Sequence, residues 1–134
     1  MKYSEVNRLK KLIRRLHSKT LPSDVEKKIF KFRKPGYDYL FKIVDESTLS
    51  EHQVANILRI LCTMRGYGEI NLFINKLLSL VEDERLKVSS TASYLLEFLL
   101  QMKENFNYLD IPLEREQLMK GFQFINSSFI YSLW

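Results

Sequence analysis

The chain repeats itself at a spacing of 37 residues, and this repeat limits the possible folds more than any other feature of the sequence. A shift of 37 residues, without a gap, aligns five apolar residues with identical ones: Leu40 with Leu77, Val44 with Val81, Leu49 with Leu86, Ala55 with Ala92, and Leu58 with Leu95. Each copy has a short apolar-periodic segment, an acidic turn and a longer periodic segment. A period of about 40 residues built from two helices is typical of a helical solenoid, in which each hairpin buries its apolar face on its neighbour.

The second copy runs from Leu77 to Leu100 and reads LLSLVEDERLKVSSTASYLLEFLL, a Leu-rich start, an acidic turn, and then Val88 and Ala92. In this order it resembles a HEAT repeat, and a weaker copy covers residues 40–63. The chain departs from the family pattern at Ser89, where an Arg often follows the Val, and it lacks the usual Pro. The resemblance implies an all-α fold, a right-handed stack of antiparallel helical hairpins (a HEAT-like α-solenoid) with about six to seven helices. A helical bundle without solenoid stacking is the alternative.

Most of the positive charge lies before the repeats. Residues 1–36 hold 12 Lys and Arg against three acids, whereas residues 37–134 hold nine against 13. Apolar periodicity predicts an amphipathic helix from Ser4 to about Lys19, and a capping box of Ser23 with Glu26 opens a shorter helix that Pro35-Gly36 should end. We therefore expect one helical domain, 1–134, made of a basic N-terminal hairpin (1–36), two HEAT-like repeats (37–110) and a C-terminal cap (111–134).

The composition favours a globular protein of the cytoplasm. Apolar residues make up 46% of the chain, with only four Gly and three Pro. The start, MKYSEVNRLKKLIRR, places charges where a signal peptide needs an apolar core, and no apolar run approaches the ~20 residues of a membrane span. The lone Cys62 excludes an intramolecular disulfide and fits a reducing compartment. We expect a cytoplasmic protein that does not bind membranes.

No residue pattern indicates catalysis or a cofactor. The two histidines, His17 and His52, lie at no metal-ligand spacing from another His, Cys or carboxylate. Gly66-Tyr67-Gly68 fits a turn between helices better than a phosphate-binding loop. The paired carboxylates fall in the acidic turns, where solvated loop charges are common. We therefore expect no enzyme, no metal, no cofactor and no small-molecule ligand.

The first functional hypothesis is a non-catalytic protein-binding module. In a HEAT-like stack the second helix of each repeat lines the concave side, and its polar positions would contact a partner. These positions are His52, Asn56, Arg59, Ser93, Glu97 and Gln101. The most concrete form is a bacterial immunity protein that binds and neutralises a toxin domain, with the mildly acidic body attracting a cationic toxin. This form rests on what small, motif-free chains commonly do.

The alternative hypothesis is an accessory protein that binds nucleic acid through its basic N-terminal helices, where Lys and Arg would neutralise phosphates. The residues assigned to this role are Lys10, Lys11, Arg14, Arg15, Lys27, Lys28 and Lys31. Tyr3 is the nearest aromatic residue along the first helix, so we expect no base stacking there. A third hypothesis, a helical-repeat DNA glycosylase, is disfavoured because the predicted concave face is mixed in charge and the single Trp134 is terminal.

Overall fold

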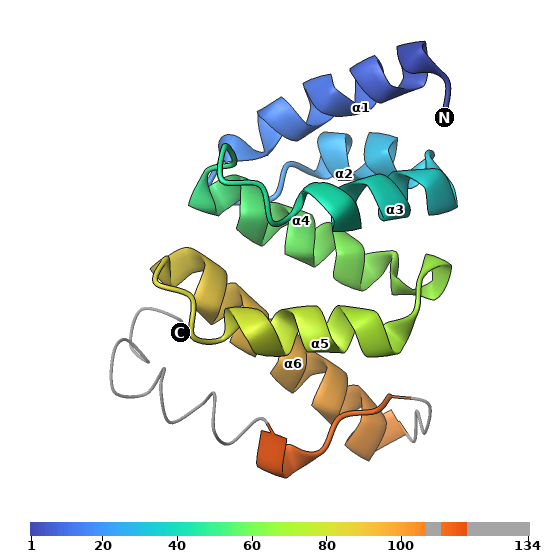
Figure 1. Ribbon diagram of the computed structural model, residues 1–134. Helices are drawn as coiled ribbons and strands as arrows, with labels where there is room; N and C mark the ends of the chain where they lie inside the picture. The colour runs from blue at the N-terminus through green and yellow to red at the C-terminus, as the bar shows by residue number, and fades with distance from the viewer. Residues whose placement is uncertain (107–110, 118–134) are drawn as a thin grey trace. The chain divides into compact units, whose positions relative to one another are not determined.

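The computed structural model describes residues 1–106 and 111–117, and three-quarters of these residues are helical with no strand among them (Figure 1). This confirms the predicted all-α class. The elements of the described residues are α1 (Tyr3–Arg14), the 3-10 helix η1 (Arg15–His17), α2 (Ser23–Phe30), α3 (Arg33–Ile43), α4 (Glu51–Thr63), the 3-10 helix η2 (Arg65–Tyr67), α5 (Ile70–Leu80) and α6 (Leu86–Phe106).

The chain divides into two compact units, residues 1–68 and residues 69–134. This division falls between the two predicted repeats. Stacking of one repeat on the other, which would make the chain a solenoid, therefore stays a prediction. The predicted C-terminal cap lies outside the described residues from position 118 onward.

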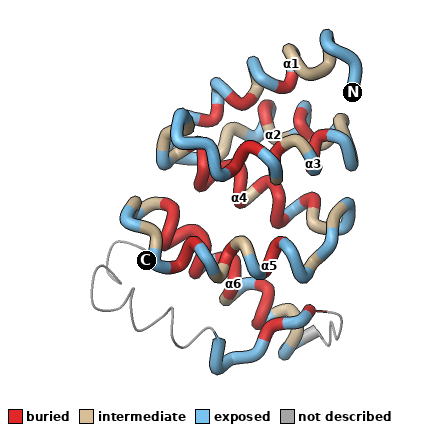
Figure 2. The backbone as a smooth tube through the Cα atoms, in the orientation of Figure 1, coloured by how far each residue is buried: buried red, intermediate tan, exposed pale blue. Residues whose placement is uncertain are grey.

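In the first unit, α1 packs on α2, α2 on α3 and α3 on α4, while η1 contacts α4. The apolar stripe of the first helix meets this core, because Leu9 and Leu16 are fully buried and Ile13 is 5% exposed. Each fully buried Leu or Ile side chain contributes about 1.5–3 kcal/mol relative to an exposed one. The opposite face of α1 is exposed, as predicted, and Figure 2 shows the two faces alternating along the helix.

Both predicted repeats form helical hairpins, α3 with α4 in the first unit and α5 with α6 in the second. Four of the five identical residue pairs are buried in both copies: Leu40 and Leu77, Val44 and Val81, Ala55 and Ala92, Leu58 and Leu95. The fifth pair differs, since Leu49 is half-buried and Leu86 is 55% exposed. Leu86 begins α6, whereas Leu49 lies in the turn before α4, so the two positions are not equivalent.

The predicted capping box at Ser23 is wrong, and the first helix begins at Tyr3 rather than at Ser4. The N-cap positions of α1 and α2 are Lys2 and Pro22, and neither makes a side-chain capping bond. The capping box is instead at the start of α4. There the Ser50 hydroxyl accepts a bond from the Gln53 backbone N–H at 3.2 Å, and the Gln53 side chain accepts one from the Ser50 N–H at 2.9 Å. This reciprocal pair satisfies two donors that a helix start leaves unpaired.

The break after α2 is also not where the sequence predicted it. Pro35 and Gly36 lie inside the first turn of α3, where a proline costs no helix hydrogen bond. The chain turns at Arg33, which has a φ of 54° and so adopts the left-handed conformation. Gly36 then allows a close contact, because a Cβ atom at this position would lie 2.6 Å from Cβ of Phe32. Phe32 is thereby held at the junction of α2 and α3.

In the second unit, α5 packs on α6 around a core that includes the fully buried Phe73 and Leu77. Residues 111–117 follow α6 and are tied back to it. Lys103 of α6 donates to the Leu113 carbonyl at 2.9 Å and to the Glu114 carboxylate at 3.0 Å. Arg115 is paired with Glu104, which lowers the pKa of that carboxyl group. These contacts anchor the described part of the C-terminal segment on the unit to which it belongs.

Candidate functional site

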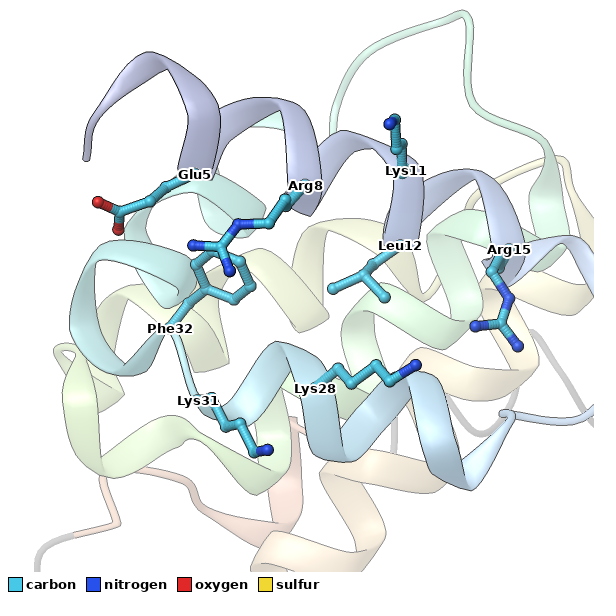
Figure 3. Close-up of a pocket in the computed structure, with 8 residues that line it drawn as sticks. All are labelled: Glu5, Arg8, Lys11, Leu12, Arg15, Lys28, Lys31 and Phe32. Atoms are coloured by element: carbon cyan, nitrogen blue, oxygen red, sulfur yellow. The ribbon is translucent and has the colours of Figure 1, made fainter.

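A groove with a volume of about 620 Å³ lies between α1 and α2 in the first unit (Figure 3). Five cationic side chains, one acid and two apolar residues line it: Arg8, Lys11, Arg15, Lys28, Lys31, Glu5, Leu12 and Phe32. All five cations are exposed, while Leu12 and Phe32 are half-buried. The groove therefore combines a positively charged rim with an apolar interior.

The two helices supply different parts of this groove. Arg8, Lys11 and Leu12 come from α1 and Arg15 from the first position of η1, at spacings of three, one and three residues, so they lie along one side of the first helix. Lys28 comes from α2, and in Figure 3 its side chain extends along the groove toward Arg15. At the other end, the guanidinium of Arg8 lies over the Phe32 ring, 5.7 Å from the ring centroid. The α1–α2 contact thus brings together cations that are distant in sequence.

Most of the groove's cations are not engaged by acids. Arg15 is the exception, because it donates to Asp24 at 2.8 Å, and this bond holds the pKa of the Asp24 carboxyl below its usual range. In the part of the chain that the structure describes, no ion pair or hydrogen bond engages Lys11, Lys28 or Lys31. The first unit holds 15 Lys and Arg against seven Asp and Glu, a formal charge of +8. Its field therefore attracts anions toward the groove.

The structure separates the seven cations that the sequence grouped as one nucleic-acid surface. Lys11, Arg15, Lys28 and Lys31 line the groove. Lys10 and Arg14 instead line a second hollow of about 350 Å³, which they share with Tyr39 and the acidic Glu46. Lys27 is exposed on α2 and lines neither hollow. Arg8 and Phe32 also line the groove, and the nucleic-acid hypothesis drawn from the sequence names neither of them.

The predicted concave strip of polar residues is wrong at two of its six positions. Asn56 is 1% exposed and Ser93 is 2% exposed, so neither offers a surface to a partner. The side chain of Asn56 points instead to the end of the first helix, where it donates to the carbonyls of Leu16 and Ser18 at 2.8 and 2.9 Å. Asn56 therefore has a structural role in the first unit.

The other four positions of the strip are exposed or half-buried. Arg59 donates to the Asn56 side-chain oxygen at 2.8 Å, and Gln101 donates to Glu97 at 3.2 Å. His52 and Arg59 belong to the first unit, whereas Glu97 and Gln101 belong to the second. The protein-binding hypothesis, including the immunity protein, stays a prediction that now rests on these four residues.

One Ser–His contact has the form of a nucleophile and its base, but its geometry serves the fold. The Ser50 hydroxyl lies 3.3 Å from Nδ1 of His17. The same hydroxyl already accepts the capping bond from Gln53, so it is fixed at the start of α4. The described residues contain no group of three or more His, Cys, Asp or Glu side chains that could hold a metal ion.

Cys62 and Tyr37 are buried and lie outside the groove. Burial raises the pKa of the Cys62 thiol to about 11, which keeps it protonated and unreactive at neutral pH. Burial likewise raises the pKa of Tyr37 to about 12. Among the described residues, the Tyr37 hydroxyl has no hydrogen-bond partner. It lies against Gly68, where an added Cβ atom would come within 2.8 Å of it.

We expect Tyr37→Phe to raise the free energy of unfolding by about 1 kcal/mol at pH 7, because it removes a buried hydroxyl that lacks a partner. The folded protein keeps the Tyr37 proton up to about pH 12, whereas the unfolded chain loses it near pH 10.0. Wild-type stability should therefore fall as pH rises above 10, and the variant should lose less. Urea unfolding at pH 7 and pH 11 measures both effects, and a variant less stable than wild type at pH 7 would contradict the assignment.

Comparisons of the chain with protein-family models, with curated proteins and with solved structures found no match. The HEAT-like resemblance accordingly stays a prediction. Across residues 1–106 and 111–117, no helix has both the length and the apolar character needed to cross a membrane.

Proposed function

We propose that this chain is a non-catalytic nucleic-acid-binding protein and that the groove between α1 and α2 is its binding surface. The observation that carries the proposal is the row of exposed cations that the two helices place around one hollow. The Cβ atoms of neighbouring cations on this side of the first helix are about 5–6 Å apart, since they recur every three or four residues. Lys28 of α2 and Lys31, which directly follows α2, also line the hollow.

The arrangement of these charges suits a linear polyanion better than a single small anion. A lone phosphate or carboxylate is usually held by two or three groups that converge on one point, often with a bidentate Arg. Here the cations extend from Arg8 to Arg15, a separation of seven residues that corresponds to about 10 Å of helix. A nucleic-acid strand presents a phosphate at every nucleotide and can therefore meet several of them at once.

The lysines of the groove that have no acidic partner within the described residues also support the proposal. Phosphates bound by Lys and Arg release counterions from the nucleic acid, and this release drives binding. Lys11, Lys28 and Lys31 make no ion pair within the described part of the chain, so no internal bond has to break before a phosphate binds them. Arg15 alone would have to exchange Asp24 for a phosphate.

Affinity that falls steeply with salt is the expected signature of this function. About four phosphate contacts predict a slope near −3 in a plot of log affinity against log salt for a single strand. We expect binding on the order of micromolar at 50 mM salt and about 50-fold weaker binding at 200 mM. Fluorescence anisotropy with a labelled 12-nucleotide single strand and a labelled 12-base-pair duplex measures both values.

Polyglutamate of matched charge is the control for this titration, because it carries anions without phosphates or bases. The proposal fails if neither nucleic acid binds at 50 mM salt. It also fails if polyglutamate competes as well as the nucleic acids do, since the groove would then serve as a general site for acidic chains such as an acidic protein surface.

A further inference from the structure

We infer that the groove takes single-stranded nucleic acid, with one unpaired base stacked on the paired side chains of Arg8 and Phe32. This inference rests on the proposed function and adds the form of the ligand and the part of the groove that contacts a base. It differs from the expectation drawn from the sequence, which found no aromatic residue placed for stacking.

The Arg8 side chain is paired with the Phe32 ring. The Arg8 guanidinium carbon lies 5.7 Å from the centroid of the Phe32 ring, within the range of a cation–π contact. Phe32 is held in place by the turn at Arg33 and by Gly36, which lies close to its Cβ atom. Arg8 is exposed, so the side of its guanidinium away from the ring is open to a ligand. Unpaired bases stack on aromatic rings and on the planar face of Arg.

This pair lies at one end of the groove. Figure 3 shows Arg8 and Phe32 at one end, Leu12 between the helices, and Arg15 and Lys28 toward the other end. Arg8 and Arg15 are separated by about 10 Å of helix. A single strand can therefore place a base on Arg8 and Phe32, with its neighbouring phosphates on Arg15 and Lys28. The apolar Leu12 gives the base edge a surface that does not require hydrogen bonds.

A duplex cannot place a base on Arg8 and Phe32 in this way. In a duplex the bases are paired and stacked on one another, so none can lie on a protein side chain without being unpaired first. Because every base has a π face, stacking of this kind tolerates any sequence. We therefore expect preference for single strands over duplexes and little preference among sequences of similar flexibility.

An abasic strand separates this inference from the proposed function, since it keeps the phosphates and lacks the bases. The probes are a 12-nucleotide oligothymidylate, an abasic 12-mer and a 12-base-pair duplex, titrated at 50 mM salt. We expect oligothymidylate to bind about 10-fold more tightly than the abasic strand, the range given by one stacked base. Equal affinity for the two strands, or tighter binding of the duplex, overturns the inference and leaves the proposed function standing. If none of the three binds, the proposed function fails as well.

Two variants locate the stacked base. Arg8→Lys keeps the charge and removes the planar guanidinium, and this exposed position is not part of the core. It should weaken oligothymidylate binding about fivefold and abasic binding by clearly less, because the charge is kept and only the stacking surface is lost. Phe32→Leu should act in the same direction, with thermal unfolding as the check that it folds. If Arg8→Lys weakens both strands equally, or neither, Arg8 acts only as a charge and the base-stacking assignment is wrong.

Discussion

Asn56→Ala is expected to lower the free energy of unfolding by about 3 kcal/mol, because it leaves buried carbonyl groups without a donor. Asn56 is 1% exposed and donates to the carbonyls of Leu16 and Ser18 at 2.8 and 2.9 Å. Its own carbonyl oxygen accepts a bond from Arg59 at 2.8 Å. One side chain thus fixes the end of the first helix on α4, and its loss removes all three bonds together.

Chemical denaturation of Asn56→Ala beside Thr63→Ala measures this effect. Thr63 is on the same helix but is exposed, and within residues 1–106 and 111–117 its hydroxyl bonds only to the Arg59 carbonyl one turn earlier in α4. Thr63→Ala should change the free energy of unfolding by less than about 0.5 kcal/mol. If the two variants are equally stable, the bonds from Asn56 do not hold the first unit together and its assignment to the core is wrong.

The burial of Asn56 also shows what a helical wheel cannot predict. The wheel placed Asn56 on the polar side of its helix because neighbouring turns carry His52 and Arg59. Its two acceptors lie 40 and 38 residues earlier in the chain, one in η1 and one directly after it. The pattern of polar and apolar residues within α4 contains no information about where another helix ends. Gln53, which donates to the Ile13 carbonyl at 3.1 Å, is a second case of the same kind.

Apolar periodicity did predict the elements that build the groove. It gave the buried stripe of α1, the exposed basic face and the short second helix, because each depends on residues within one helix. The groove itself depends on how α1 and α2 pack, and that contact decides that Lys11 and Lys28 line one hollow while Lys10 and Lys27 do not. The position of Phe32 depends on the turn at Arg33. This arginine has a positive φ, which the sequence does not predict.

Reversing two charges of the groove is expected to weaken binding of the single strand about 100-fold at 50 mM salt. Lys11→Glu with Lys28→Glu removes two phosphate contacts and adds two repulsive charges at the same positions. Lys10→Glu with Lys27→Glu is the matched control, since it changes the same helices and the same net charge outside the groove. The control should lose less than about 10-fold, through the weaker field of the whole unit.

The affinity ratio of these two double variants is the most direct test of the groove as the binding surface. All four lysines are exposed, so both proteins should unfold at nearly the wild-type temperature. Anisotropy titrations of the 12-nucleotide strand give the two dissociation constants under identical conditions. The groove predicts that Lys11→Glu with Lys28→Glu binds at least about 10-fold more weakly than Lys10→Glu with Lys27→Glu. Equal losses in the two variants would show that binding follows net charge alone, and would contradict the assignment of the site to the groove between α1 and α2.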